Sequence, residues 1–213
     1  MSSPDESARS GLTSAPEPER MSIILPSAWQ VIDLDPATRD RSARRLIRQA
    51  VGSADSLALY RRWAEQAYHS MITEATESGA FFAATYDEQV AGRPLSASLL
   101  VFIGRLPVDD RGSPVTVEEM LRVLVEPGAG ESMLEPPTVV ELGLGTAARS
   151  RVRTTAEVPE SDRTVPVDLT RFFLPRADWD RLLVMAFSTV ILPASDALAE
   201  LFDLIALGAR WRD

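Results

Sequence analysis

The pattern of apolar and polar positions is most regular in the last third of the chain. Two dense apolar segments, Val165–Leu174 and Leu182–Leu192, flank a short polar turn at residues 176–180. Apolar segments joined by such a turn are typical of a β-hairpin. The run Ser195–Leu207 then repeats apolar residues at helical spacing. The sequence therefore predicts a hairpin followed by a C-terminal helix that packs back onto it.

The C-terminal helix has a predicted start, end and buried face. Ser195 is the expected N-cap, and Gly208 is expected to end the helix. The residues expected to face the sheet recur at positions i, i+3, i+4 and i+7, namely Leu198, Leu201, Phe202 and Ile205. The residues expected to face water are Asp196, Glu200 and Asp203.

Two more amphipathic helices are predicted nearer the N-terminus. The first is expected to start at Asp35-Pro36, because aspartate caps helices and proline fits the first turn, and to end at Gly52. Its apolar stripe consists of Ala43, Leu46, Ile47 and Ala50. The second is expected over Asp55–Ser78, with Gly79 at its end. Its expected buried face consists of Tyr60, Trp63, Ala64, Ala67 and Met71.

Other apolar segments have the spacing of strands. A short edge strand with a proline break is expected over Ile23–Ile32, since proline cannot lie inside a central ladder. Thr116 and Glu119 have the spacing of a capping box, which predicts a short helix through Leu124. Glu126–Pro137 contains two glycines and three prolines and is expected to be a loop. The further strands expected are Phe81–Gln89, Ala97–Leu106, Val139–Leu144 and Ala147–Val158.

These elements define the predicted architecture. Strands joined by short turns favour an antiparallel sheet, so the predicted class is α+β, with an antiparallel sheet of about six strands flanked by helices. Residues 1–20 are rich in Ser, Pro and Glu and lack periodicity, so we expect a disordered N-terminal arm. Residues 21–213 are expected to form a single α+β domain.

Composition and charge exclude several kinds of chemistry. The chain has no cysteine, a single histidine and a net charge of −9. Without cysteine there is no disulfide, thiolate nucleophile or cysteine-ligated zinc. The acidic balance argues against nucleic-acid binding. No apolar run is long enough to cross a bilayer and no signal peptide opens the chain, so we expect no membrane insertion and a cytoplasmic location.

No catalytic or nucleotide-binding motif is present in the sequence. The helical phase places His69 on the polar face opposite Tyr60, so we expect this imidazole to be solvated rather than catalytic. Gly143-Leu144-Gly145 lacks the third glycine and the lysine of a phosphate-binding loop. We therefore expect a protein that is not an enzyme and has no catalytic residues, no metal and no cofactor.

All 22 basic residues are arginine, and asparagine is absent as well as lysine. Lysine and asparagine both have AT-rich codons, so their joint absence indicates a GC-rich genome such as that of an actinobacterium. The alternative explanation is selection for anion recognition, at which the planar guanidinium excels.

Four arginines cluster on the first predicted helix, opposite its apolar stripe: Arg41, Arg44, Arg45 and Arg48. This cluster is the clearest charge asymmetry in an acidic chain. One interpretation is a solvated helix face. The other is a docking surface for an acidic segment of a protein partner. Nucleic acid is less favoured, because no aromatic residues interleave with these arginines.

A second set, Arg149, Arg151 and Arg153, alternates along one predicted strand, so the three side chains project from the same face of the sheet. Neighbouring guanidinium groups repel one another. Compensation is expected from carboxylates on a neighbouring strand, from open solvent or from an anionic ligand. These three arginines are therefore also candidate partner-binding residues.

The C-terminal third contains Phe172-Phe173-Leu174-Pro175, then Leu182–Thr189, then Leu198–Trp211. This order resembles that of small actinobacterial proteins with a PsbP-like fold. The opening Leu25-Pro26-x-x-Trp29 is also similar to the start of such chains, with Ala28 in place of their glycine. The resemblance implies an antiparallel sheet flanked by helices. It further implies a binding module, in some members a chaperone of secreted substrates, and no catalytic residues.

The sequence thus predicts a non-enzymatic cytoplasmic protein-binding module, an adaptor or chaperone-like factor tied to protein secretion. The alternative prediction is a small-molecule binding protein with an apolar pocket between the sheet and the helices. Such a pocket would need convergent polar groups around it.

Overall fold

The computed structural model describes residues 21–51, 58, 62, 69, 72–73, 75–77, 79–90, 93–157 and 163–212. The arm expected at residues 1–20 and the end expected at Gly52 lie outside these residues. So does the buried face expected for the second helix, which consists of Tyr60, Trp63, Ala64, Ala67 and Met71. The described residues between 58 and 77 are helical, and Gly79 follows them with a positive φ of 81°, the conformation in which glycine commonly ends a helix.

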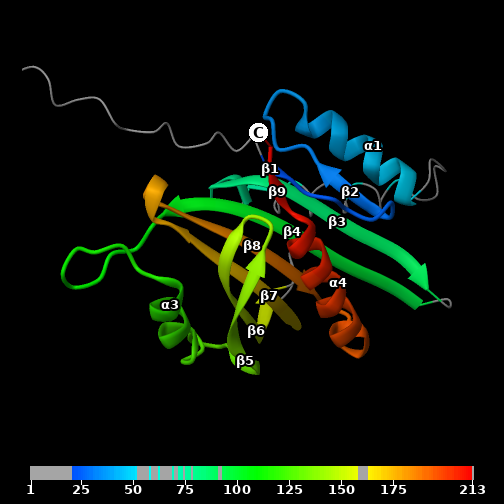
Figure 1. Cartoon of the computed structure of the whole chain (residues 1–213). Helices are drawn as coiled ribbons and strands as arrows, with labels where there is room; N and C mark the ends of the chain where they lie inside the picture. Colours follow the sequence, from blue (N-terminus) through cyan, green and yellow to red (C-terminus); the bar gives the residue numbers. More distant parts are fainter. Residues whose placement is uncertain are drawn as a thin grey trace, which may run out of the picture.

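The described elements are mostly strands, with helices between some of them (Figure 1). In chain order they are β1 (Met21–Ser22), β2 (Trp29–Ile32), α1 (Arg39–Val51), β3 (Ala80–Val90), β4 (Arg93–Arg105), α3 (Val117–Leu124), β5 (Ser132–Leu142), β6 (Gly145–Glu157), β7 (Thr164–Arg176), β8 (Arg181–Thr189), α4 (Ser195–Gly208) and β9 (Arg210–Trp211). Two short 3-10 helices, η3 (Ala177–Trp179) and η4 (Leu192–Ala194), precede β8 and α4.

Seven strands form one antiparallel sheet in the order β2-β3-β4-β8-β7-β6-β5. The α+β class with an antiparallel sheet flanked by helices is confirmed. The C-terminal hairpin β7–β8 lies between the hairpins β3–β4 and β5–β6, so both of its strands have a neighbour on each side. A separate pairing of β1 with β9 places Met21 opposite Trp211 and was not predicted.

One face of this sheet is covered by α4 (Figure 1). Alternate residues of β8, including Met185 and Phe187, are fully buried beneath the helix. Leu198, Phe202 and Ile205 of α4 are buried and Leu201 is partly buried against them, which confirms the predicted docking of the C-terminal helix. Ser195 is the first helical residue rather than a cap, because its hydroxyl donates to the Asp168 carboxylate at 2.5 Å instead of accepting from the helix backbone.

The opposite face of the sheet carries α3 at one end. The predicted capping box is confirmed: the Thr116 hydroxyl accepts from the Glu119 amide, and the Glu119 carboxylate accepts from the Thr116 amide. Val117 and Met120 of α3 are buried against Ala148 of β6. At the other end, Ile72 packs with Ile32 and Ala83, which puts part of the second helix on the same face.

Three predicted boundaries are wrong. The edge strand expected over Ile23–Ile32 is confined to Trp29–Ile32, because the chain turns after Pro26 and the Trp29 amide donates to the Pro26 carbonyl oxygen. The loop expected over Glu126–Pro137 ends early, because β5 begins at Ser132 and includes Pro136 and Pro137. A strand at the edge of a sheet tolerates proline, because amides that point away from the neighbouring strand have no partner to donate to. The pairing of β5 with β6 is also irregular, with a shift of register on both sides of Glu135. The first helix begins at Arg39 rather than at Asp35-Pro36. The Asp35 carboxylate instead accepts from the Ala37 amide and caps a turn that precedes the helix.

Candidate functional site

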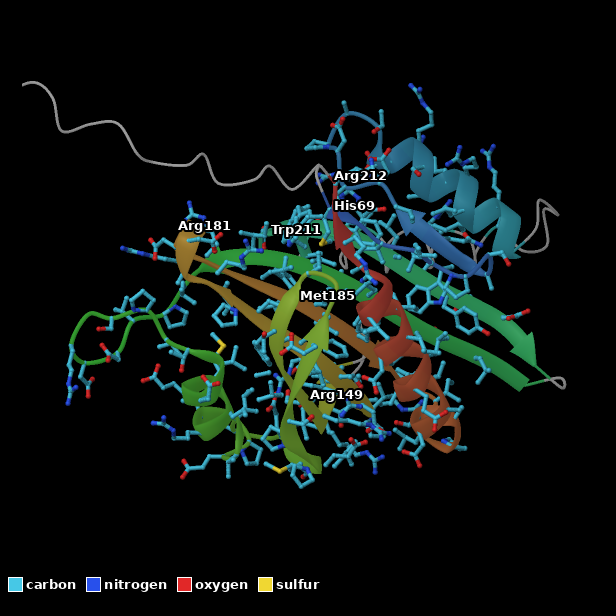
Figure 2. The ribbon with its side chains drawn as sticks, viewed as in Figure 1. His69, Arg149, Arg181, Met185, Trp211 and Arg212 are labelled. Atoms are coloured by element: carbon cyan, nitrogen blue, oxygen red, sulfur yellow. The ribbon has the colours of Figure 1, made fainter. Side chains whose placement is uncertain are left out.

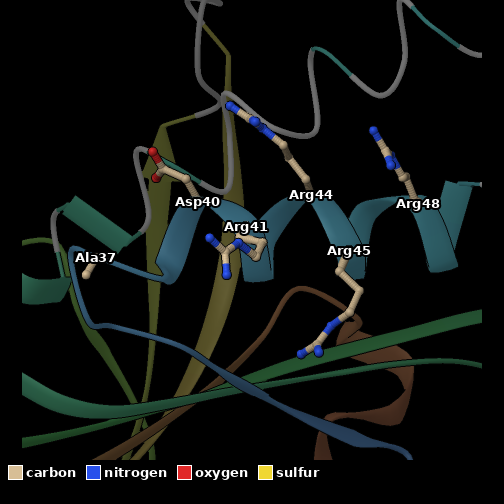
Figure 3. A pocket seen from close by; sticks show the side chains of 6 residues that line it. All are labelled: Ala37, Asp40, Arg41, Arg44, Arg45 and Arg48. Atoms are coloured by element: carbon tan, nitrogen blue, oxygen red, sulfur yellow. The ribbon is translucent and has the colours of Figure 1, made fainter.

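The exposed face of α1 carries the four arginines that the sequence singles out (Figure 3). Arg41, Arg44, Arg45 and Arg48 are all exposed, whereas Ser42, Ala43 and Ile47 on the other side of the helix are buried. Figure 3 shows Arg44 and Arg48 extending away from the sheet and Arg45 extending toward it. Together with Ala37 and Asp40 the four arginines line an open pocket of about 740 Å³. The structure thus gathers these positions into one surface, which we call the α1 arginine face.

Carboxylates do not neutralise the α1 arginine face within the part of the chain that the structure describes. Asp40 is the one acidic residue among the described residues that line the pocket. Its carboxylate lies 3.9 Å from Nε of Arg39 and 3.5 Å from Nδ1 of His69, and it makes no ion pair with the four arginines of the face. The result is a concentrated positive surface on a chain whose net charge is −9.

His69 lies beside α1, where its imidazole faces the Asp40 carboxylate (Figure 2). Its side chain is 56% exposed, which confirms that the only histidine of the chain lies on a wet surface. A general acid or base usually acts from a cleft that excludes bulk water, and this position has no such shelter.

The second arginine set lies on β6, on the face of the sheet that α4 covers, and Figure 2 shows Arg149 near α4. Arg149 donates from Nε to Asp203 of α4 at 2.7 Å and from Nη1 to Glu135 of β5 at 2.8 Å. Arg151 donates from Nη1 to the other oxygen of Glu135 at 2.6 Å. The two guanidinium groups are therefore bridged by one carboxylate.

The same row continues toward the start of α4. Arg151 donates from Nη2 to Asp196 and to the hydroxyl of Ser195, each at 2.7 Å. Arg153 makes a two-point contact with Asp168 of β7, at 2.6 and 2.9 Å. Because Ser195 also donates to Asp168, a continuous network joins strands β5, β6 and β7 to α4.

Of the three kinds of compensation expected for this row, the structure supplies carboxylates. Compensation by open solvent is a wrong prediction for Arg149 and Arg151, because these residues are only 8% and 6% exposed. The carboxylates come from both neighbouring strands and also from α4, where Asp196 and Asp203 were expected only to face water. Binding of a partner by Arg149, Arg151 and Arg153 stays a prediction, and their charges already have an internal role.

The network lowers the pKa of two of its carboxyl groups. Desolvation raises the pKa of Glu135, but hydrogen bonds from Arg151 and Arg149 outweigh it and hold this pKa below the ordinary value of 4.5. At Asp168, desolvation likewise raises the pKa. Hydrogen bonds from Arg153 and Ser195 outweigh it and hold this pKa below the ordinary value of 3.8. Both groups therefore stay ionised at neutral pH.

A second concave surface lies between the outer strand β5 and the last two turns of α4. This groove, of about 580 Å³, has an apolar lining of Val140, Leu142, Phe172, Leu204 and Leu207. Polar groups also line it, namely Glu141, Arg149, Glu200 and Asp203. The sequence allowed for an apolar pocket between sheet and helices without locating it. The available signal was Leu204 and Leu207, two leucines on the otherwise polar side of α4.

Comparison with known proteins gives no family for the chain. No protein-family model matches the sequence, and no curated protein matches it. Among solved structures, the chain is similar to LpqN of Mycobacterium tuberculosis, described as involved in cell envelope biogenesis. The similarity covers 91% of this chain and 83% of LpqN, with a TM-score of 0.43 and 8% sequence identity.

Two further properties hold for the described part of the chain. None of its helices is long and apolar enough to span a bilayer. No group of three or more His, Asp or Glu side chains is placed there to hold a metal ion.

Proposed function

We propose that this protein is a non-enzymatic protein-binding module, an adaptor or chaperone-like factor, that docks an acidic segment of its partner on the α1 arginine face. The observation that carries the proposal is a contrast between two sets of arginines. Those on β6 are each matched by carboxylates within the chain. The four of the α1 arginine face are exposed and make no ion pair with any described residue.

The spacing of the four arginines suits a carboxylate-rich partner. Arg41, Arg45 and Arg48 follow one another by about one turn, so they span roughly 10 Å along one side of the helix. Guanidinium groups bind carboxylates through two parallel hydrogen bonds, and several such contacts along one helix would favour a segment with several acidic side chains. The open pocket beside the helix would admit that segment without rearrangement of the sheet.

The proposed link to protein secretion comes from the resemblance of the sequence to PsbP-like proteins, some of which are chaperones of secreted substrates. An adaptor of this kind needs a stable scaffold with one binding surface and no reaction centre. The seven-stranded sheet with α4 locked onto it is a suitable scaffold.

The experiment compares two triple variants with the wild type. Arg41→Glu/Arg45→Glu/Arg48→Glu reverses the α1 arginine face. Arg105→Glu/Arg111→Glu/Arg122→Glu makes the same change in net charge at exposed arginines elsewhere. Each protein is titrated with a fluorescent oligoglutamate peptide and used for capture from a lysate of the native host. We expect only the α1 variant to lose the peptide and the captured proteins.

Salt provides an independent arm of this experiment. Attraction between exposed charges is screened over about 8 Å at physiological ionic strength, so wild-type binding should weaken steadily as salt rises. Binding that survives both high salt and the α1 variant would mean that these arginines are ordinary solvated charges. Equal loss in both triple variants would show a general charge effect rather than a docking surface.

A second candidate function is binding of a small molecule in the groove between β5 and α4. Its volume of about 580 Å³ lies in the range of ligand sites in proteins. Its lining combines apolar side chains with a few polar groups, the combination that this alternative requires.

A further inference from the structure

We propose that the groove between β5 and α4 takes an amphiphilic cation, a small molecule with a hydrocarbon body and one positively charged amine end. This inference rests on the second candidate function and names the chemical class of its ligand. It is independent of the α1 arginine face.

The apolar part of the groove is made by side chains that the fold leaves uncovered. Leu204 is 65% exposed and Leu207 is 48% exposed, although the other large apolar side chains of the helix are buried or partly buried. They face Val140 and Leu142 of the outer strand, and the buried ring of Phe172 lies at the floor. Contiguous apolar surface of this kind commonly marks a binding site.

The polar part of the groove is acidic. Glu200, Asp203, Leu204 and Leu207 follow one another at i, i+3, i+4 and i+7, so they form a single stripe along α4. This stripe is acidic toward the start of the helix and apolar toward its end. Glu200 and Leu207 are separated along the helix by about 10 Å, a span that suits a medium-length alkyl chain with a charged head at one end.

The charges around the groove are unequal in number. The groove and its adjoining network hold three cations, Arg149, Arg151 and Arg153, and six carboxylates: Glu135, Glu141, Asp168, Asp196, Glu200 and Asp203. Arg149 is already paired with Glu135 and Asp203, so its positive charge is compensated within the chain. Glu141 accepts from the Thr146 hydroxyl, whereas Glu200 is an exposed carboxylate that makes no hydrogen bond or ion pair with the described residues. A cationic group beside Glu200 would therefore gain an ion pair.

The charge at the other end of the groove also favours a ligand whose cationic group lies beside Glu200. Arg210 donates to the carbonyl oxygens of Leu207 and Ala209, so a fixed positive charge lies just past the end of α4. A ligand cation is repelled from that end and attracted to the Glu200 end. The hydrocarbon body then lies over Leu204 and Leu207, where it covers apolar surface that is otherwise in contact with water.

The test uses three probes that share one alkyl chain and differ in head-group charge: octylammonium, octanol and octanoate. Each is titrated into the full chain and followed by two-dimensional NMR of the backbone amides, which reports both affinity and position. We expect the largest shifts in β5 and in the second half of α4. Octylammonium should bind about fivefold more tightly than octanol, and octanoate more weakly than either, since an exposed ion pair contributes a modest free energy.

Two pairs of variants separate charge from apolar contact. Glu200→Gln should reduce the preference for octylammonium over octanol, whereas Glu118→Gln, an exposed carboxylate on α3 at the opposite face, should not. Leu204→Ser should weaken all three probes, whereas Val123→Ser on α3, where Val123 is 72% exposed, should weaken none.

The outcomes distinguish the two ideas. If octanol binds in the groove as tightly as octylammonium, the small-molecule function stands and the cationic class is wrong. If no probe shifts the amides of β5 and α4, both the small-molecule function and this inference are overturned. Equal effects of Glu200→Gln and Glu118→Gln would also overturn the inference.

Discussion

The ring of Phe202 on α4 stacks on the ring of Phe187 on β8, with centroids 4.8 Å apart and planes inclined by 17°. Trp29 meets both rings edge-on, at 6.3 and 6.4 Å. Both phenylalanines are fully buried. Three segments that are far apart in the sequence, β2, β8 and α4, are therefore joined by one aromatic cluster, and the position of the helix on the sheet depends on it.

Replacing Phe202 by alanine should cost about 3–5 kcal/mol of unfolding free energy, the usual range for an aromatic side chain truncated in a packed core. The measurement is equilibrium unfolding in urea. Leu204→Ala on the exposed side of the same helix is the matched control and should change stability by less than about 0.5 kcal/mol. A loss below about 1 kcal/mol for Phe202→Ala would contradict the packing described above.

The pairing of Arg149 with Asp203 predicts unequal roles for two neighbouring acidic residues of α4. Asp203→Asn should cost about 1 kcal/mol, because it weakens a charge-assisted hydrogen bond that is partly screened by solvent. Glu200→Gln should be close to neutral, since Glu200 is exposed and lies outside the network. Thermal unfolding of both variants makes the comparison, and equal melting temperatures would show that the network does not hold the helix.

Acid should destabilise the protein through Glu135 and Asp168. Both have pKa values depressed in the folded state, so the stability that they contribute is fully present above their ordinary values of 4.5 and 3.8. It is lost as the pH falls through the depressed values. Urea midpoints measured above pH 4.5 and below pH 3.8 should therefore differ.

The double variant Glu135→Gln/Asp168→Asn is the control for this acid effect. It should be less stable than the wild type near neutral pH, because it lacks the ion pairs of Glu135 with Arg149 and Arg151 and that of Asp168 with Arg153. It should also lose less stability on acidification. If both proteins lost the same stability, the acid sensitivity would arise from other carboxylates.

His69→Gln should change neither the melting temperature nor binding of the oligoglutamate peptide appreciably. The imidazole is 56% exposed, and its contact with Asp40 at 3.5 Å joins two surface groups, so little free energy depends on it. Thermal unfolding and the peptide titration provide the measurement. A collapse of peptide binding would place His69 in the docking surface.

Much of the fold follows from local signals that involve few residues. The capping box at Thr116 and Glu119 predicts α3, because both halves of the motif lie within one turn. The stripe that contains Phe202 predicts which side of α4 is buried, because helical periodicity fixes the relative directions of its side chains. The alternation of Arg149, Arg151 and Arg153 likewise predicts their common face.

The rest depends on which elements become neighbours, and periodicity does not determine that. Asp196 and Asp203 have the pattern of solvated helix residues, and they become partners of Arg151 and Arg149 only because α4 crosses β6. Ser195 has the sequence position of an N-cap, but its hydroxyl oxygen accepts from the Arg151 guanidinium and its proton is donated to the Asp168 carboxylate. The groove was missed for the same reason, since its two walls are β5 and α4.

Pro136 and Pro137 in β5 have a consequence for the behaviour of the protein in solution. A strand at the edge of a sheet offers unpaired amides to which another chain can add a strand, and this is a common route to aggregation. Proline has no amide hydrogen, and the irregular register around Glu135 bends the strand away from a flat edge. The strand β2 at the other edge is only four residues long. The sheet is thus poorly suited to serve as a template for fibrils, and the protein should stay dispersed at high concentration.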